Sequence, residues 1–448
     1  MSVYNYSRRL VPRTRGGFLA AISLLLVIVF WSFQEAEAAS GPQAVLTPTS
    51  LLFADTAVGK TSTDQTVTLR NPGTATLKIS SVTLTGADLA DFAVTNACGK
   101  TLTKGKSCAI RLRFTPVSAG GFSAAIRVVD NAAGSPHTVA LSGTGISGTG
   151  TQSLIVEPDQ GMTPIYDLLN SAKKTIDMTM YELVDTQCQQ ILAHQAAKGV
   201  AVRVILDQAL EKSSNTLAYT FLNANGVKAV WANPVFQSSH QKTITVDGKT
   251  TAIMTLNLTS RYYSTSRDFA VIEDNANDIA AIEATFNADF VSSAITPPNG
   301  DDLIWSPTNA LSALLGLIGA AKTSLEVENE EMGDAQIVTA LEGAAKRGVT
   351  VEVAMTNGGE YTGEFNALKA AGVKVKTYAT TAPLYIHAKM ILADYGQSGQ
   401  VGFVGSENFS NPSLTENREL GLTVTDPSIL GALSTTFGSD FQGGTPWP

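Results

Sequence analysis

Two short stretches of the sequence repeat one arrangement of residues that could perform nucleophilic and acid–base chemistry. The stretches read HQKTITVD and HAKMILAD, and both follow the pattern H-x-K-x4-D, 147 residues apart. The chain has only four histidines, so two of the four begin this pattern. A single histidine in an apolar run is most simply a core residue, and the repetition argues against that interpretation. The repeated residues are His240, Lys242 and Asp247 in the first stretch and His387, Lys389 and Asp394 in the second.

The agreement between the two stretches continues downstream. Asn257 precedes Asp268 by eleven residues, and Asn408 precedes Glu419 by the same interval. Each part of the chain therefore offers one His, one Lys, one Asn and one acidic residue at parallel positions. Across a two-fold-like interface, the two sets could converge on one shared site.

Physical reasoning assigns roles to these residues. Side chains two apart on a strand face the same side, so the His and Lys of each H-x-K should point together. Asp247 and Asp394 lie an odd seven residues after their histidines, which indicates a supporting role on the opposite face. Lysine charges and asparagine amides can bind a tetrahedral anion. One histidine can attack phosphorus while the other protonates the leaving oxygen, and Asp268 and Glu419 are the candidates to orient the two rings.

The sequence resembles the phospholipase D superfamily, the HKD phosphodiesterases. The resemblance covers nearly all of residues 153–442 and rests on HQKTITVD, HAKMILAD, GSENFS and NREL. It implies hydrolysis or transfer of a phosphodiester through a covalent phosphohistidine, with no metal and no other cofactor. In members with two motifs the N-terminal histidine is usually the nucleophile. That rule maps to His240 and leaves His387 as the general acid, although the sequence itself offers complete neighbours to both.

One departure from the family pattern concerns the residues that support the first motif. The second half carries the expected GS-x-N as Gly405, Ser406 and Asn408, whereas the first half reads MTLN with Thr255 in place of Ser. A threonine hydroxyl can still donate a hydrogen bond, so we expect activity to survive. Met254 stands where the family has glycine, which predicts a different backbone in that loop.

Alternating helix and strand patterns predict an α/β fold for the region that holds the motifs. The segment at residues 157–183 parallels residues 306–332, and AAKGVAVRVIL parallels AAKRGVTVEVAM. We therefore predict two repeated α/β halves, at residues 154–297 and 301–442, packed face to face. Because one chain carries both motifs, a monomer should form the active unit.

Residues 44–145 have a different character, with short alternating strands separated by Gly, Pro, Asn and Asp turns. About seven such strands predict an immunoglobulin-like sandwich. The stretch also resembles bacterial Ig-like modules of the choice-of-anchor D type, which imply a spacer or adhesion role. Cys98 and Cys108 flank a turn-rich segment and predict a disulfide, whereas Cys188 is interpreted as a buried apolar residue. Residues 146–153 are predicted to be a flexible linker.

The first 38 residues are predicted to be a secretory signal peptide. Four arginines precede an apolar stretch, and the small-residue sequence AEAAS follows it. The expected location is secreted, periplasmic or at the cell surface. The net charge of −8 argues against a broad nucleic-acid-coating role.

The substrate predicted from these features is a phospholipid, cleaved at its head-group phosphodiester at a membrane or vesicle surface. A nuclease groove should carry additional Lys and Arg, and ATTAPLYI before His387 has none. Nucleic acid is therefore a less favoured substrate, and a secreted endonuclease is the second hypothesis. A third is a non-catalytic adhesion protein. Glu182 and Glu331, at equivalent repeat positions, could contact a head group but are interpreted as solvated strand-end carboxylates.

Overall fold

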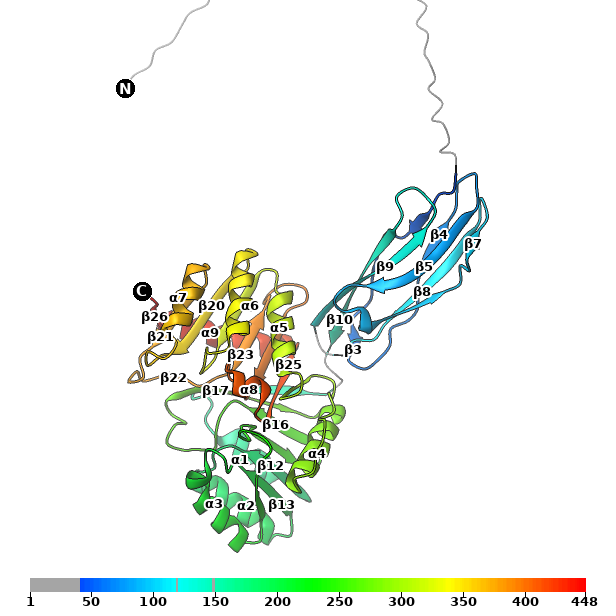
Figure 1. Cartoon of the computed structure of the whole chain (residues 1–448). Coiled ribbons are helices and arrows are strands. Elements are labelled where there is room, and N and C mark those ends of the chain that lie inside the picture. Colours follow the sequence, from blue (N-terminus) through cyan, green and yellow to red (C-terminus); the bar gives the residue numbers. More distant parts are fainter. Residues whose placement is uncertain (1–40, 118–119, 147–149) are drawn as a thin grey trace, which may run out of the picture. The chain divides into compact units, whose positions relative to one another are not determined.

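The computed structural model describes residues 41–117, 120–146 and 150–448, so the predicted signal peptide lies outside the described residues. An all-β domain comes first and an α/β domain follows (Figure 1). This confirms the predicted fold class. None of the described helices is long and apolar enough to cross a membrane.

The β domain is a sandwich of two sheets. One sheet has the order β1 (Val45–Thr47), β4 (Gln65–Arg70), β8 (Ser107–Phe114) and β6 (Phe92–Asn96). The other has the order β2 (Ser50–Leu52), β10 (His137–Ile146), β9 (Gly120–Asp130), β5 (Leu77–Thr85) and β7 (Thr101–Leu102), with β3 (Thr56–Ala57) also paired to β10. A 3-10 turn, η1 (Leu89–Asp91), precedes β6.

Alternate side chains of these strands fill the space between the sheets, as the period of two requires. On β8, Ile110, Leu112 and Phe114 are fully buried while Arg111 and Arg113 between them are exposed. The predicted disulfide is present between Cys98 and Cys108. A cross-link of this kind supports a small β domain whose core alone is modest in size.

The first α/β half is one mixed sheet with helices on its faces. Its strand order is β11 (Gln152–Glu157), β17 (Ser266–Glu273), β16 (Thr250–Met254), β15 (Thr243–Val246), β12 (Thr175–Met180), β13 (Ala201–Leu206) and β14 (Lys228–Trp231). Its helices are α1 (Thr163–Ser171), α2 (Thr186–Ala197), α3 (Lys212–Ala224) and α4 (Ala276–Phe290). Only β12, β13 and β14 run parallel, and the helices between them make the crossovers.

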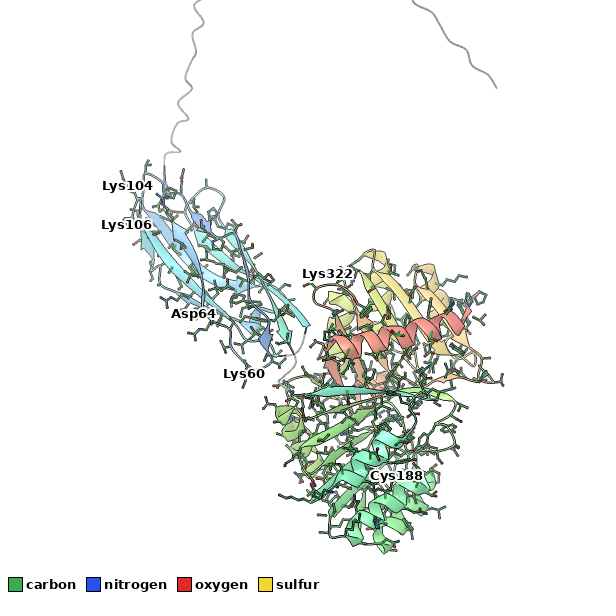
Figure 2. The ribbon with its side chains drawn as sticks, turned by 180° about the vertical axis from the view of Figure 1, so that it is seen from behind. Lys60, Asp64, Lys104, Lys106, Cys188 and Lys322 are labelled. Carbon is green, nitrogen blue, oxygen red and sulfur yellow. A yellow bond between two sulfur atoms is a disulfide. The ribbon has the colours of Figure 1, made fainter. Side chains whose placement is uncertain are left out.

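The second half repeats this strand order and adds one strand, β26, beyond β21. Its order is β18 (Leu303–Ser306), β25 (Glu419–Val424), β24 (Val401–Gly405), β23 (Met390–Ala393), β19 (Ser324–Glu328), β20 (Thr350–Thr356), β21 (Lys374–Tyr378) and β26 (Thr445–Pro446). Its helices are α5 (Ala310–Ala320), α6 (Ala335–Lys346), α7 (Thr362–Ala370), α8 (Asn411–Thr415) and α9 (Pro427–Gly443). Helix α9 packs on β19, β20 and β23 and is seen lengthwise in Figure 2.

Equivalent aspartates begin equivalent helices in the two halves. The Asp185 carboxylate accepts hydrogen bonds from the backbone at the start of α2, and Asp334 does the same for α6. Cys188, one turn into α2, is fully buried in the core of the first half (Figure 2), as the sequence predicted.

The two halves share one apolar core. It contains Ile253, Phe269 and Val271 from the first sheet together with Met390, Val404 and Leu422 from the second. Two buried ion pairs cross the interface in a symmetric way. Arg267 on β17 binds Asp440 on α9, and Arg418, just before β25, binds Asp289 on α4.

Short extended segments also cross between the halves. Strand β22 (Tyr385–Ile386) pairs with Ser266 and Arg267 of β17, and Ser239 forms a single bridge with Arg418. The segment that leads into each motif histidine is thus held by the strand that carries the acidic residue of the other half.

The predicted linker, residues 146–153, overlaps a strand at each of its ends. Ile146 ends β10, residues 147–149 lie outside the described part of the chain, and Gln152 already begins β11. Gln152 and Ser153 belong to the sheet because they pair with Glu273 and Ile272 of β17.

Candidate active site

His240 is held in place by the second half of the domain. It lies three residues before β15, and Lys242 also precedes that strand, which corrects the expectation that the H-x-K residues sit within the strand. Its backbone N–H donates to the carbonyl of Arg418 at 3.0 Å. Its Nδ1 lies 2.7 Å from Oε2 of Glu419 and 3.1 Å from the carbonyl oxygen of Ser406.

His387 mirrors this arrangement with partners from the first half. It lies between β22 and β23, and its N–H donates to the carbonyl of Arg267 at 3.2 Å. Its Nδ1 lies 2.7 Å from Oδ1 of Asp268. Each ring is therefore oriented by the acidic residue of the opposite half. A carboxylate at Nδ1 accepts that proton and leaves Nε2 as the reactive nitrogen.

The two motif lysines are completely buried. Lys242 Nζ donates to the carbonyl of its own motif residue His240 at 2.6 Å, and Lys389 Nζ donates to that of His387 at 2.6 Å. An ammonium has three donors, and burial without compensating acceptors is costly. Burial, and then the neighbouring ammonium of Lys389, lowers the pKa of Lys242 to about 7. The two buried ammonium groups are near enough for each charge to act on the other, and such a pair is suited to bind an anion.

Thr255 and Ser406 occupy matching positions behind the acidic residues. The Thr255 hydroxyl accepts from the N–H of Phe269 at 2.9 Å, and the Ser406 hydroxyl accepts from the N–H of Leu420 at 3.1 Å. Thr255 also donates to Asp268 at 2.6 Å. The substitution of Ser by Thr in the first half therefore keeps the hydroxyl contact to the strand that carries the carboxylate.

The two predicted asparagines reach the site from opposite halves. Asn257 lines a cavity beside His387, and Asn408 lines another beside His240. The Oδ1 atoms of both are buried without a hydrogen-bond partner among the described residues. Asn408 Nδ2 donates to Glu331 Oε1 at 3.2 Å and to Glu330 Oε2 at 3.4 Å.

Asp247 and Asp394 lie outside this group of side chains. Both adopt a left-handed backbone conformation, with φ of 55° and 53°. The Asp247 carboxylate accepts the N–H groups of residues 173–175, and the Asp394 carboxylate accepts those of residues 322–324. Each aspartate thus fixes the turn that leads into a central strand of its own half.

Glu330 is the site residue that sequence reasoning missed. Its Oε2 lies 3.4 Å from Nε2 of His387 and 3.0 Å from Nζ of Lys389, and its Oε1 accepts the hydroxyl of Tyr385 at 3.1 Å. The repeat offset of 149 residues pairs Glu330 with Tyr181, whose ring lies edge-on 4.5 Å from the His240 ring. The offset is visible in the sequence, but the sequence does not show that either residue lies beside a motif histidine.

Two further glutamates differ from their predicted solvated state. Glu182 is buried and accepts Thr259 Oγ1 at 2.8 Å and Arg261 at 3.2 Å. Glu331 accepts the Asn408 amide, and burial raises the pKa of Glu331. Glu182 follows the end of β12 and is buried, whereas Glu331 follows the end of β19 and is half-buried.

The electrostatics of the two histidines differ. Burial lowers the pKa of His240, and although Glu419 opposes this effect the neutral ring is favoured. Burial alone would raise the pKa of Glu330, but His387 and Lys389 outweigh it and hold that pKa well below its usual value. His387 therefore faces carboxylate oxygens at both ring nitrogens, with Asp268 at Nδ1 and Glu330 at Nε2.

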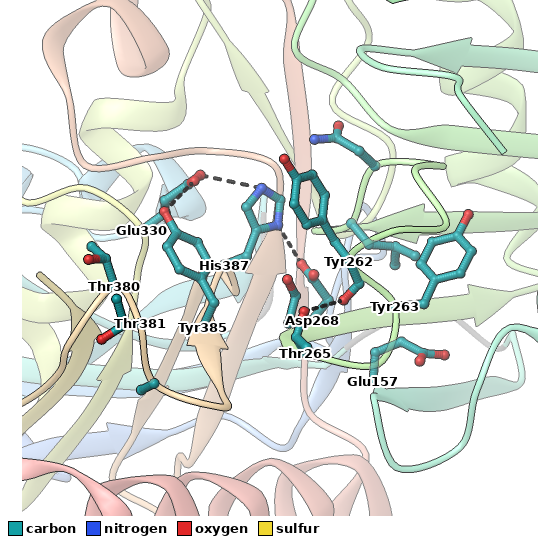
Figure 3. Close-up of a pocket in the computed structure, with 14 residues that line it drawn as sticks. Glu157, Tyr262, Tyr263, Thr265, Asp268, Glu330, Thr380, Thr381, Tyr385 and His387 are labelled. Atoms are coloured by element: carbon teal, nitrogen blue, oxygen red, sulfur yellow. Dashed lines mark hydrogen bonds and ion pairs between the residues drawn. The ribbon is translucent and has the colours of Figure 1, made fainter. Parts of the chain in front are cut away.

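Two cavities open onto the site, one at each histidine. The larger, of about 540 Å³, reaches His387 and Asp268 and is lined by residues of both halves (Figure 3). The smaller, of about 260 Å³, reaches His240, Tyr181 and Asn408. The described residues contain no group of three or more His, Cys, Asp or Glu side chains arranged to hold a metal ion.

The family of the α/β domain follows from comparison with known sequences. Residues 165–290 and 314–441 match the family described as "Cardiolipin synthase, PLD-like domain", which covers more than half of the chain. The chain belongs to the phospholipase D superfamily. Residues 42–138 match a second family, described as "Abnormal spindle-like microcephaly-assoc'd, ASPM-SPD-2-Hydin". Members of the phospholipase D superfamily are enzymes that handle phosphodiesters. A search of curated proteins found no match.

Solved structures share the fold of this superfamily member at low sequence identity. The polyphosphate kinase of Porphyromonas gingivalis matches with a TM-score of 0.53 and 16% identity over 64% of this chain, which spans 46% of the kinase. The phosphatidylserine synthase of Haemophilus influenzae matches with a TM-score of 0.51 and 13% identity, over 66% of this chain and 87% of the synthase. Nuc of Salmonella typhimurium, a phospholipase D family member, is 24% identical over 32% of this chain and 95% of its own, with a TM-score of 0.30.

Proposed function

We propose that this protein is an exported phospholipase D-like phosphodiesterase that hydrolyses, or transfers, the head-group phosphodiester of phospholipids. The observation that carries the proposal is the crossed pairing of His240 with Glu419 and of His387 with Asp268, both at 2.7 Å. This pairing supplies two oriented imidazoles beside two buried lysines, which is what a phosphohistidine mechanism requires.

In the first step His240 attacks phosphorus through Nε2. Its neutral ring has a free lone pair there because Nδ1 donates to Glu419. The bond from phosphorus to the head-group oxygen breaks, and His387 Nε2 gives its proton to that oxygen. Lys242, Lys389 and the amides of Asn257 and Asn408 bind the non-bridging oxygens, where negative charge accumulates.

In the second step a water molecule, or another alcohol, replaces the departed head group. His387, now neutral at Nε2, takes a proton from it, and its oxygen attacks phosphorus. The bond between phosphorus and His240 breaks and regenerates the free ring. Water as acceptor yields phosphatidic acid, and an alcohol as acceptor yields an exchanged phospholipid.

Several features support a phospholipid substrate and an extracellular location. The described residues that line the larger cavity include no Lys or Arg, whereas a nuclease groove needs cations for the nucleic-acid backbone. The disulfide and the Ig-like domain are consistent with an extracellular protein. The predicted signal peptide accords with export. Both motifs lie on one chain, so the proposed active unit is a monomer.

The test is to incubate the purified protein with phosphatidylcholine vesicles and, separately, with single- and double-stranded DNA, all in EDTA. Release of choline and phosphatidic acid by the wild type, lost in His240→Ala and in His387→Ala, supports the proposal. DNA cleavage without lipid turnover would favour the secreted endonuclease instead. The absence of any turnover would favour the third hypothesis, a non-catalytic adhesion protein that acts through its Ig-like domain.

A further inference from the structure

Glu330 breaks the symmetry of the site. Its counterpart Tyr181 places an aromatic ring against His240 and 4.9 Å from Nζ of Lys242. Glu330 instead places a carboxylate against both His387 and Lys389. These contacts on Nε2 and Nζ are the ones that an oxygen of the bound phosphate would make. The carboxylate of Glu330 thus stands where substrate must enter.

Phosphate binding would take partners away from Glu330. A phosphodiester that engages Lys389 and His387 leaves the Glu330 carboxylate with the Tyr385 hydroxyl and the more distant amide of Asn408. The bound phosphodiester also brings its own negative charge close to the Glu330 carboxylate. The Glu330 side chain is 24% exposed. Leaving a partly buried anion without a cation is still unfavourable, so a substrate that carries only negative charge meets an electrostatic penalty here.

The larger cavity is lined by acidic and aromatic side chains that could bind a positively charged head group, and such a head group would remove this penalty. Glu330 and Tyr385 border it from the second half, and Glu157, Tyr262 and Tyr263 border it from the first (Figure 3). Glu157 is only 2% exposed, and neither of its carboxylate oxygens has a hydrogen-bond partner among the described residues. An unpartnered carboxylate and tyrosine rings are the groups that bind an organic ammonium.

The position of this cavity matches the leaving group. In an in-line displacement the leaving oxygen lies on the side of phosphorus away from the nucleophile. The proposed acid His387 stands at this cavity, so the departing head group would occupy it. Glu330 lies between the lysine that holds phosphate and the space that holds the head group.

We propose that Glu330 is a specificity-determining residue that selects phospholipids with a cationic head group, of the choline or ethanolamine class. The inference rests on the proposed function, because it assumes that His387 protonates the head group. When phosphate takes Lys389, Glu330 turns to the ammonium of the same substrate. A zwitterionic head group thus keeps every charge paired.

The experiment compares two substrates that differ only in charge. Short-chain phosphatidylcholine below its critical micelle concentration is one, and the matching ester of 3,3-dimethylbutanol, in which carbon replaces nitrogen, is the other. The wild type should favour the choline ester in kcat/KM by about tenfold or more. Glu330→Gln should reduce that ratio toward one, and Glu157→Gln should lower it in part. The matched control is Glu342→Gln, the same change on helix α6, where Glu342 pairs with Lys346.

A binding measurement separates this inference from the proposed function. Tetramethylammonium chloride is titrated calorimetrically into the wild type with and without saturating inorganic phosphate. Because phosphate frees Glu330, tetramethylammonium should bind more tightly in its presence, and Glu330→Gln should abolish the difference. Equal substrate ratios in wild type and Glu330→Gln, with both esters turned over, overturn the inference alone. Turnover of neither ester overturns the proposed function, and equal tetramethylammonium binding with and without phosphate overturns the inference by itself.

Discussion

The Nδ1 atom of His240 lies 2.7 Å from Oε2 of Glu419, a residue 179 positions later in the chain and in the other half of the domain. His387 and Asp268 form the same contact in the opposite direction. Neither half holds a complete set of catalytic groups by itself. The proposed site is therefore formed only where the two halves of the α/β domain meet.

Loss of the carboxylate at His240 should slow the first chemical step. Glu419→Gln keeps the shape but can no longer favour the tautomer with a free Nε2 lone pair, so we expect kcat to fall by about 10²–10⁴-fold. Asp268→Asn is the matched change at the other histidine. Pre-steady-state kinetics with a chromogenic diester would check the assignment. A normal rate of phosphohistidine formation in Glu419→Gln would contradict it.

The assignment of His240 as nucleophile predicts a trapped intermediate. In His387→Ala, a p-nitrophenyl ester of phosphatidic acid should still release about one equivalent of p-nitrophenolate, since this leaving group needs no proton. Release of choline by the same variant should be lost. Intact mass measurement should find the phosphatidyl adduct on His240. A burst in His240→Ala instead of His387→Ala would reverse the two roles.

Anion binding should change the protonation of Lys242. Its pKa of about 7 means that a large fraction of the free protein lacks this charge at pH 8. The groups that face it are Lys389, Glu419, Glu330, Asp268, His240 and the ring of Tyr181. A bound anion stabilises the ammonium, so a phosphonate that stays singly charged should take up a proton on binding at pH 8 and much less at pH 6. Calorimetry in buffers of different ionisation enthalpy measures this uptake, and Lys242→Met should remove it.

Glu157 should make the folded domain less stable as the pH rises. Burial, followed by the charges of Asp268 and Asp159, raises its pKa to about 7 from the ordinary 4.5. Between these values the folded state binds more protons than the unfolded state, so the free energy of unfolding falls with increasing pH. Glu157→Gln should therefore leave the Tm at pH 5 almost unchanged and raise it at pH 8, by an amount worth up to about 3 kcal/mol. Equal shifts of Tm at both values would show that Glu157 does not ionise in this window.

The duplicated motifs were enough to predict the fold and to propose most residues of the candidate site. His240, Lys242, Asn257 and Asp268 have a fixed spacing that recurs in the second half, so repetition identified them without any coordinates. Asp247 and Asp394 do lie away from the histidines, but not for the predicted reason. Each histidine precedes its strand, and each aspartate follows the end of that strand in a left-handed conformation. Alternating burial in the first domain followed from the period of two on each strand.

The sequence could not show which partners meet across the interface. The crossed contacts join residues 119 and 179 positions apart, and no local pattern encodes such a separation. Glu330 was missed for a related reason. In ENEEMGD it looks like one of several surface acids, and only the strand register places Glu328 in the core and Glu330 beside Lys389. The burial of Lys242 depends on the same packing.

The buried arginines that cross the interface between the two halves predict what happens when the chain is divided there. Arg267 binds the last helix of the second half, and Arg418 binds the last helix of the first. Expressed as separate polypeptides, the halves should be inactive alone and recover turnover when mixed. With that outcome the two halves would act like two subunits joined by a tether, and the rate of the proposed reaction would report whether they are assembled.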